Sequence, residues 1–300
     1  MKLLDALNKR KEHNQELEDE KVLNKIKEVI KNADAILIGA GAGLSTSAGL
    51  SYSGKRFEDN FSDFIDKYGM EDMYSAGFYP FNTQEEKWAY WSKHIFYNRY
   101  DVGATEVYRQ LYQLVEEKNY FVLTTNVDHQ FELTGFENER IFATQGDYGM
   151  FQCAKGCHNK LYENENVVKE MIVKQKDCKI PTSLVPICPV CGGHMEVNLR
   201  IDGDFVQDEN WYKAADKYSS FLEENQNKKL VFFELGVGMN TPGIIKYPFW
   251  QMTNQWSNAF YICINKGEAW APDEIRERSI CIDGDIGQVL EVLGNEERVQ

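Results

Sequence analysis

The fold is decided by the stretch Ala35-Ile36-Leu37-Ile38-Gly39-Ala40-Gly41-Ala42-Gly43-Leu44-Ser45-Thr46-Ser47-Ala48-Gly49. An apolar run ends in alternating glycines, and three hydroxyl side chains that can cap a helix follow. The pattern predicts a buried parallel strand, a tight turn and the start of a helix. Glycines let the backbone approach a ligand closely, and the free N–H groups at a helix start suit a phosphate. The pattern is not a regular G-x-G-x-x-G, because Leu44 stands where the third glycine would be.

Five further apolar segments are predicted strands, and each ends in small or polar residues. They cover residues 120–123, 140–143, 230–235, 259–264 and 279–282. In an open α/β sheet the ligand crevice lies outside the carboxyl ends of the strands. Six polar strand ends that meet at one edge therefore predict an α/β fold with a Rossmann-like parallel sheet and a nucleotide site.

The chain divides into a helical start, a nucleotide-binding domain and an inserted module. Residues 1–31 are a predicted N-terminal helical segment. Residues 32–146 and 205–300 form the predicted Rossmann-like domain, and 55–117 are its helical, aromatic-rich part. Residues 147–204 break the rhythm of strands and helices, which indicates a separate small module.

Charge and hydropathy limit the partners and the compartment. The formal net charge of −14 argues against a general nucleic-acid or anionic-membrane surface. No apolar stretch approaches the roughly 20 residues that a membrane span needs. The charged start lacks the apolar core of a signal peptide, so a cytoplasmic protein is expected.

Two pairs of cysteines bracket the small module. Cys153 and Cys157 precede a polar segment, and Cys188 and Cys191 follow it as a Cys-x-x-Cys turn. This arrangement predicts a closed structural Cys₄ zinc site that serves folding. Spare ligands that could substitute are Cys178, His158 and His194. A redox-active Cys-x-x-Cys is the alternative.

The order of these features resembles the sirtuin family of NAD-dependent deacylases and ADP-ribosyltransferases. Residues 41–49 are similar to the family's G-A-G-x-S-x-x-x-G, and 124–128 to its T-Q-N-I-D. The cysteines lie where sirtuins insert a zinc module. Gly236-Val237-Gly238 stands for G-T-S, Asn265 for the asparagine near the adenosine ribose, and Asp285-Ile286 for the last adenine contact.

Departures from the family pattern point to one subgroup. Gln145-Gly146 stands where sirtuin deacylases have histidine-glycine, and Ser51-Tyr52-Ser53-Gly54 replaces P-D-F-R. An F-G-E element is missing near residues 205–207. Together these features resemble the macrodomain-linked microbial sirtuins. That class implies ADP-ribosylation of a lipoate-carrying, glycine-cleavage-H-like protein and a macrodomain partner that removes the mark.

The resemblance implies NAD as cosubstrate and assigns the site residues. Asn126, Gln145, Asp128 and Arg200 are the expected catalytic group, with Arg200 orienting Gln145 or meeting the partner. The pyrophosphate is expected against the amides of Ala42 and Gly43 and the hydroxyl of Ser45 or Thr46. The complete set of expected cofactor-binding residues is Gly41, Ala42, Gly43, Ser45, Thr46, Tyr52, Thr125, Asn126, Asp128, Gln145, Gly236, Gly238, Met239, Asn240, Asn265, Asp285 and Ile286.

The reaction predicted from this set is transfer of ADP-ribose to a protein acceptor. A glutamine cannot titrate, so Gln145 should impair deacylation while still orienting the ribose. The alternatives are a deacylase with an unusual base such as His129, a non-catalytic NAD or ADP-ribose sensor, and a free-standing NAD glycohydrolase.

Overall fold

The computed structural model describes residues 19–240 and 242–294. A helix over 19–31 represents the predicted N-terminal helical segment, and residues 1–18 of that segment lie outside the described residues. Within the described residues, no helix combines the length and the apolar character that crossing a bilayer requires.

Six strands form the central sheet. Their bounds are Ala35–Ala40 (β1), Tyr120–Thr124 (β2), Ile141–Ala143 (β3), Leu230–Leu235 (β7), Phe260–Asn265 (β8) and Ser279–Asp283 (β9). The order across the sheet is β3-β2-β1-β7-β8-β9, and every neighbouring pair is parallel. The strand order therefore reverses between β1 and β7, which is where a Rossmann-like sheet opens its ligand crevice. The predicted fold class is confirmed.

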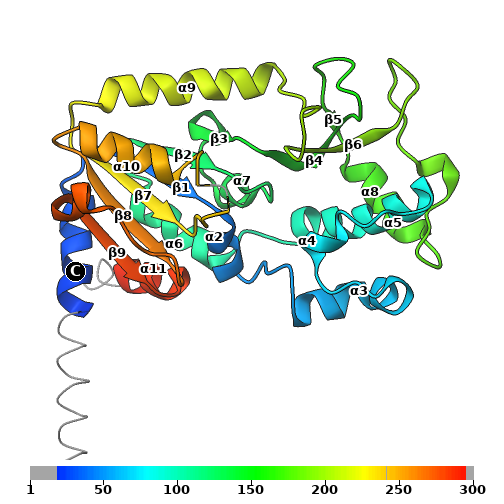
Figure 1. The fold of residues 1–300 in the computed structure, drawn as a ribbon, viewed down its shortest axis with the longest axis horizontal. Coiled ribbons are helices and arrows are strands. Elements are labelled where there is room, and N and C mark those ends of the chain that lie inside the picture. Colours follow the sequence, from blue (N-terminus) through cyan, green and yellow to red (C-terminus); the bar gives the residue numbers. More distant parts are fainter. Residues whose placement is uncertain (1–18, 241, 295–300) are drawn as a thin grey trace, which may run out of the picture.

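Helices cover both faces of this sheet (Figure 1). One face carries the helix 19–31, α2 (Ala42–Ser47), α6 (Glu106–Val115), α7 (Gln130–Thr134) and α11 (Ile286–Gly294). The other carries α9 (Glu209–Asn225), α10 (Lys246–Gln255) and the 3-10 helix η4 (Asp273–Arg278). Alternate side chains of β1 enter the two cores, Ile36 and Ile38 in one and Leu37 in the other, as the pleat of a strand requires.

A second, antiparallel sheet lies beside the first. It has the order β5-β4-β6, with the bounds Gly146–Cys153 (β4), Tyr162–Glu163 (β5) and Met195–Leu199 (β6). The elements around it are α3 (Lys55–Tyr68), α4 (Met73–Ala76), α5 (Gln84–Ile95), the π-helix η1 (Phe96–Tyr100), α8 (Glu165–Lys174) and the 3-10 helix η3 (Thr182–Leu184). One further 3-10 helix, η2 (Asn138–Arg140), precedes β3.

The helical segment 55–117 is divided between the two sheets. The sequence grouped all of it with the Rossmann-like domain, but α3, α4 and α5 share one apolar core with β4, β6 and α8. Trp88 on α5 and Phe151 on β4, for example, have ring centroids 4.7 Å apart. Only α6 packs on the large sheet. Helical periodicity identifies an apolar face but not the element that covers it. The domain boundaries themselves stay a prediction.

Candidate active site

The glycine turn after β1 packs directly against the turn after β7. The Gly43 N–H donates to the Gly236 carbonyl at 2.9 Å. Gly236 has a φ of 64°, and a Cβ there would lie 2.3 Å from the nitrogen of Leu44. A Cβ on Gly41 would lie 2.6 Å from the Gly236 carbonyl oxygen. Both turns therefore require glycine, because backbone packs directly on backbone between the ends of β1 and β7.

Four buried polar side chains tie the end of β2 to α2. The Ser45 hydroxyl donates to Asp128 Oδ2 at 2.5 Å and lies 2.8 Å from the Tyr108 hydroxyl. The Asn126 Nδ2 lies 3.0 Å from the Gly41 carbonyl and 3.1 Å from both Ser45 Oγ and the Tyr108 hydroxyl. The structure thus brings three predicted site residues together. Tyr108, on α6, is a member that the sequence reasoning missed.

Asp128 is engaged on both of its carboxylate oxygens. Its Oδ1 accepts from the Gln130 N–H at 3.2 Å, while Oδ2 accepts from Ser45. Burial raises the pKa of Asp128, and the hydrogen bond from Ser45 opposes that rise. These bonds fix the loop after β2 in one conformation. A contact of Asp128 or Ser45 with a dinucleotide stays a prediction.

Two other predicted residues, Thr46 in α2 and Thr125 after β2, make hydrogen bonds to main-chain carbonyls. The Thr46 hydroxyl donates to the Ala42 carbonyl at 3.0 Å, one turn back in α2. The Thr125 N–H donates to the Ala40 carbonyl at 3.0 Å and so continues the ladder between β1 and β2. Ala42 and Thr46 are exposed.

Gln145 and Arg200 lie side by side where the two sheets meet. Gln145 is in the connection from β3 to β4, and its carbonyl accepts from the Arg200 N–H at 3.1 Å. Arg200 follows β6 directly and is exposed, while Gln145 is half-buried. Among the described residues, neither side chain is in a hydrogen bond or ion pair with the protein. The backbone therefore places these two residues next to each other, and both side chains are unengaged.

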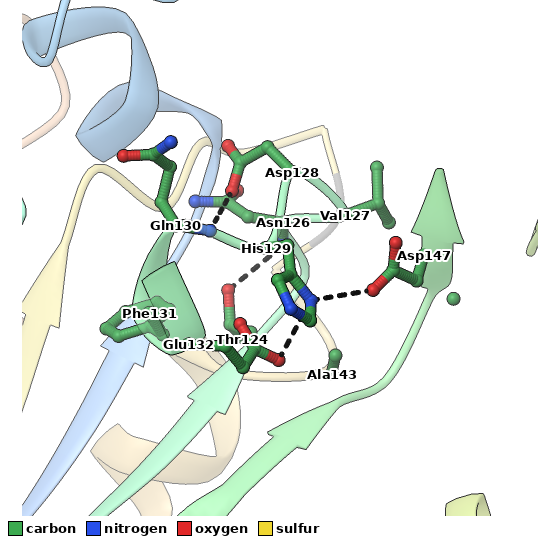
Figure 2. A pocket seen from close by; sticks show the side chains of 11 residues that line it. Thr124, Asn126, Val127, Asp128, His129, Gln130, Phe131, Glu132, Ala143 and Asp147 are labelled. Carbon is green, nitrogen blue, oxygen red and sulfur yellow. Dashed lines mark hydrogen bonds and ion pairs between the residues drawn. The ribbon is translucent and has the colours of Figure 1, made fainter. Parts of the chain in front are cut away.

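A small pocket opens at the carboxyl ends of β2 and β3 (Figure 2). Asn126 and Asp128 line it, and Gln145 does not. His129 also lines it and has a left-handed backbone with a φ of 64°. Figure 2 shows the imidazole turned toward two carboxylates, with Nδ1 2.9 Å from Asp147 Oδ2 and 3.5 Å from Glu132 Oε1. His129, the alternative base, is thus already paired through Nδ1.

Asp147 links this pocket to η1, one of the helices around the small sheet. Its Oδ1 accepts from Arg99 Nε at 2.9 Å, while Oδ2 faces His129. Burial acts to raise the pKa of Asp147, but the hydrogen bond with His129 and the charge of Arg99 outweigh it and lower that pKa. Burial raises the pKa of Glu132. Nothing in the sequence indicated that Arg99, on η1, would reach Asp147.

Tyr52 lies in the link between α2 and α3 and packs against the apolar core that α3, α4 and α5 share with the small sheet. Its hydroxyl lies 2.7 Å from that of Tyr148, which in turn lies 2.9 Å from His94 Nε2. Burial raises the pKa of Tyr52 to about 12 and lowers that of His94 to about 3. The sequence had singled out Tyr52 alone. The sequence reasoning missed Tyr148 and His94, because nothing in either stretch indicates that the two side chains meet.

The remaining predicted cofactor-binding residues lie at or after the ends of β7, β8 and β9. The Asn265 Nδ2 donates to the Val237 carbonyl at 3.0 Å. The Met239 N–H donates to Glu268 Oε2 at 2.8 Å, and Gly238, Met239 and Asn240 are exposed. Glu268 is a further residue that the sequence reasoning missed.

Asp285 and Ile286 join the last strand to the glycine turn. Asp285 Oδ2 accepts from the Ser47 hydroxyl at 3.0 Å, and that hydroxyl oxygen accepts from the Gly287 N–H at 2.9 Å. Ile286 is buried at the start of α11. The start of α11 is therefore anchored to α2, which lies on the same face of the sheet.

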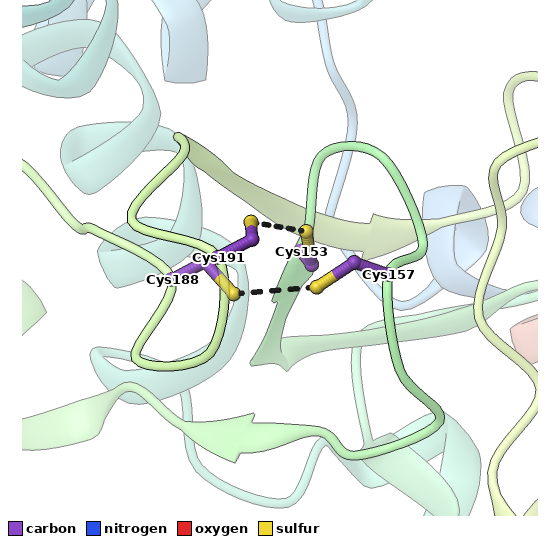
Figure 3. A group of neighbouring side chains, drawn as sticks. All are labelled: Cys153, Cys157, Cys188 and Cys191. Atoms are coloured by element: carbon purple, nitrogen blue, oxygen red, sulfur yellow. Dashed lines mark hydrogen bonds between the residues drawn. The ribbon is translucent and has the colours of Figure 1, made fainter.

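Four cysteines converge at one end of the small sheet (Figure 3). The sulfurs of Cys153, Cys157, Cys188 and Cys191 all lie within 4.8 Å of one another, and two of the separations are 3.7 Å. Tetrahedral zinc with Zn–S bonds of about 2.3 Å needs sulfurs about 3.8 Å apart. The donor set and its spacing fit structural zinc. Cys178 lies elsewhere, with its sulfur 3.5 Å from the Asp63 carbonyl.

Comparison with known proteins gives one family and two relatives of similar name. The model described as the Sir2 family matches residues 41–222. A "Protein ADP-ribosyltransferase" of Staphylococcus aureus (strain Mu50) is 38% identical over 266 residues, which cover 88% of this chain and 84% of that protein. A "Probable bifunctional ADP-ribose hydrolase/ADP-ribosyltransferase" of Fusarium oxysporum f. sp. cubense is 30% identical over 286 residues. That match covers 90% of this chain and 47% of the fungal protein.

Solved structures share the fold at low sequence identity. Sir2Tm bound to a propionylated peptide has a TM-score of 0.60 and 17% identity, covering 93% of this chain and 99% of that chain. Sir2 with a p53 peptide and NAD+ has a TM-score of 0.56 and 16% identity, covering 92% and 98%. The family model spans more than half of the chain, and the staphylococcal relative aligns over most of both proteins. The chain therefore belongs to the Sir2 family, the sirtuins.

Proposed function

We propose that this sirtuin is an NAD-dependent protein mono-ADP-ribosyltransferase that releases nicotinamide. Two relatives carry ADP-ribosyltransferase in their names, and one sirtuin structure of the same fold holds NAD+ together with a peptide. The observation that carries the proposal is Gln145, whose side chain is unengaged in the position where deacylating sirtuins have histidine.

The chemistry of an amide separates transfer from deacylation. In deacylation a base must take the proton of a ribose hydroxyl, and a histidine does so near neutral pH. The amide of Gln145 only donates and accepts hydrogen bonds, so it orients the ribose without titrating. Cleavage of the bond to nicotinamide needs stabilisation of positive charge on the ribose rather than a strong base. The acceptor protein then provides the nucleophile.

The contacts described above suggest how the crevice holds NAD, which supplies the ADP-ribosyl group and the nicotinamide leaving group. The turn amide of Ala42 would bind the pyrophosphate at the start of α2, whereas the expected amide of Gly43 is already bonded to the Gly236 carbonyl. The loop fixed by Asn126 and Asp128 would border the nicotinamide side, together with Gln145. On the adenosine side the assigned residues are Asn265, Asp285 and Ile286. Gly236, Gly238, Met239 and Asn240 would border the dinucleotide after β7.

The acceptor that we propose is a lipoyl-carrier protein similar to the glycine-cleavage H protein. This choice rests on the resemblance to macrodomain-linked sirtuins. The name of the fungal relative, which joins an ADP-ribose hydrolase to an ADP-ribosyltransferase, supports a link to an enzyme that removes the mark. The exposed Arg200 beside Gln145 is a cation that could meet an acidic or lipoyl-bearing surface.

Labelling with NAD tests the proposal. Purified protein is incubated with labelled NAD and a lipoyl carrier, with and without its lipoyl group, and the modified residue is mapped by mass spectrometry. We expect one ADP-ribose per acceptor and an equal amount of released nicotinamide. Gln145→Ala and Asn126→Ala should reduce labelling at least tenfold, because under this proposal Gln145 would orient the reacting sugar and Asn126 would hold the loop beside it.

Matched variants and a second substrate give the controls. Gln251→Ala changes an exposed glutamine on α10 and should label normally. Acyl-lysine peptides are offered with NAD in parallel. Robust formation of O-acyl-ADP-ribose would reject the transferase in favour of a deacylase. Nicotinamide release without protein labelling would indicate a glycohydrolase, and slow release that neither variant changes would indicate a sensor.

A further inference from the structure

A chain of hydrogen-bonded side chains runs from Tyr52 into the core shared by α3, α4, α5 and the small sheet. Its links are Tyr52 to Tyr148 at 2.7 Å, Tyr148 to His94 Nε2 at 2.9 Å, and His94 Nδ1 to the Tyr90 hydroxyl at 3.1 Å. The Tyr90 hydroxyl lies 2.6 Å from the Met73 carbonyl, where the chain ends. His94 and Tyr90 are buried. The function proposed above uses only Tyr52.

The terminal carbonyl fixes the direction of every bond in the chain. A carbonyl oxygen only accepts, so the Tyr90 hydroxyl donates its single proton to the Met73 carbonyl. The Tyr90 oxygen must then accept from His94 Nδ1, which therefore carries the imidazole proton. A neutral imidazole has one N–H, so His94 Nε2 accepts from the Tyr148 hydroxyl. The Tyr148 oxygen is left to accept from Tyr52, which donates inward.

Burial keeps this arrangement the same across the physiological pH range. It lowers the pKa of His94 to about 3, so the imidazole stays neutral. It raises the pKa of Tyr52 to about 12, and that of Tyr148 is raised as well, so both hydroxyls keep their protons. The hydroxyl of Tyr52 has therefore no proton to offer elsewhere. Its oxygen keeps lone pairs that can accept.

Two backbone bonds place the chain next to the predicted site. The Tyr148 N–H donates to the Val127 carbonyl at 3.0 Å, and Val127 stands between Asn126 and Asp128. The Tyr52 carbonyl accepts from the Met73 N–H at 2.8 Å. The first and last members of the hydrogen-bonded series are therefore bonded to each other, which fixes the link between α2 and α3. Tyr52 is only half-buried. Tyr148, His94 and Tyr90 are all buried, so a ligand that meets these hydrogen-bonded side chains meets them at Tyr52.

We propose that Tyr52 meets the bound dinucleotide only as a hydrogen-bond acceptor, and that Tyr148, His94 and Tyr90 are positioning residues that set this polarity. Tyr52 then selects a donor on the ligand, a ribose hydroxyl or the carboxamide N–H₂, and disfavours an acceptor-only group there. The identity of the ligand rests on the proposed function. The direction of the chain does not.

Calorimetric titration with NAD measures the effect on binding. Tyr52→Phe removes the oxygen that accepts from the ligand. Tyr148→Phe keeps that oxygen but removes the group that accepts the Tyr52 proton, so the proton can point at the donor group of the ligand. We expect each variant to raise the Kd of NAD by about 2- to 12-fold, which corresponds to one hydrogen bond of about 0.5–1.5 kcal/mol. The Tyr52→Phe/Tyr148→Phe double variant should have a Kd for NAD no higher than that of the single variant that binds NAD more weakly, because both changes remove the same hydrogen bond.

The proton on His94 gives a readout that packing alone would not move. In spectra of protein labelled with ¹⁵N-histidine, the His94 signal, identified by its loss in His94→Gln, should show a neutral ring protonated at Nδ1. Tyr148→Phe should shift the Nε2 resonance of His94. Tyr97→Phe changes another tyrosine packed on the same core and should leave both the spectrum and the Kd unchanged.

The outcomes separate this inference from the proposed function. A proton on Nε2, unchanged Kd values in Tyr52→Phe and Tyr148→Phe, or additive losses in the double variant would each overturn the inference. Normal protein labelling together with such a result would leave the transferase proposal intact. Changed Kd values in a protein that labels no acceptor would support the inference and reject the transferase proposal.

Discussion

Gly146, next to Gln145, has a backbone that other residues do not fit. Its φ is 101°, and a Cβ there would lie 1.9 Å from the carbonyl oxygen of Asn198 on β6. That oxygen belongs to the backbone, so it can move only if β6 moves. We expect Gly146→Ala to lower the free energy of unfolding by about 3 kcal/mol or more, because strain and a steric clash act together. Urea denaturation measures the change.

Gly203 provides the matched control for that substitution. It follows β6 in the same part of the chain, and nothing lies within 4 Å of the Cβ it would gain. Gly203→Ala should change the unfolding free energy by no more than about 0.5 kcal/mol. Equal stability of the two variants would show that the contact between β4 and β6 adapts without cost.

The neutral, buried His94 predicts a loss of stability in acid. Its pKa is about 3 in the folded protein, against an ordinary value of about 6.5. Below pH 6.5 the unfolded chain binds a proton at this position and the folded chain does not. The unfolding free energy should therefore fall as the pH drops from 6.5 toward 3, with a contribution of about 2 kcal/mol lost at pH 5. Urea titrations between pH 5 and 7.5 measure the slope.

Replacement of single histidines isolates this contribution. His94→Gln removes the titrating ring, so its stability should depend less steeply on pH than that of the wild type. His194→Gln removes an exposed histidine and should keep the wild-type slope. If His94→Gln kept that slope as well, His94 would not be the group that the acid titrates.

At the scale of elements, a buried ion pair joins α10 to the central sheet. Lys246 on α10 and Glu234 on β7 form a salt bridge, and both side chains have 0% exposure. Glu234 also accepts from the Tyr261 hydroxyl on β8 at 2.7 Å. Lys246→Met leaves this carboxylate buried without a counter-charge. We expect it to lower the unfolding free energy by about 3–5 kcal/mol.

A double variant and a surface pair test whether charge is the cause. In the Glu234→Gln/Lys246→Met double variant both charges are gone, so the loss should be smaller than for Lys246→Met alone. Lys213 and Glu209, exposed on α9 with an N–O distance of 2.7 Å, form the comparison pair. Lys213→Met should cost no more than about 0.5 kcal/mol. A double variant as unstable as Lys246→Met would point to lost packing.

Local patterns were sufficient to predict the elements of the large sheet. Its six strands are apolar runs ended by glycine or polar residues, and all six lie where the sequence placed them. The partner of the aromatic face of α3 was not predictable, because Phe57, Phe61 and Phe64 indicate a buried face and nothing more. The strand β4 was also missed, since residues 146–153 mix polar and aromatic side chains without a clear period.

At the scale of the whole molecule, the candidate site was predictable where it depends on strand ends. Asn126 and Asp128 follow β2 directly, and strand ends of a parallel sheet meet at one edge. The groups that hold them in place come from distant segments. Tyr108 reaches Ser45 across 63 positions, and His94 reaches Tyr148 across 54. Such pairs depend on how elements distant in the sequence pack within one core, which one sequence does not reveal.

The four-cysteine cluster should stabilise more of the chain than the small module alone. Cys153 ends β4, and that strand packs with Trp88 of α5 in a core that also contains α3 and α4. We expect one zinc per chain by elemental analysis. Removing it with a chelator under reducing conditions should loosen this second core and shift the emission of the buried Trp88 to longer wavelength. The parallel sheet has its own cores, so far-UV dichroism should change less.

Two cysteine variants distinguish a metal site from a set of free thiols. Cys188→Ser removes one of four converging ligands, so it should lose zinc and show the same loosening without any chelator. Cys281→Ser changes a cysteine on β9, far from the cluster along the chain, and should keep its zinc. A protein that contains no zinc, yet keeps Trp88 buried when reduced, would contradict the metal's structural role. In that event the 3.7 Å spacing of the sulfurs would reflect packing alone. A redox-active Cys188 and Cys191 would then be the favoured interpretation.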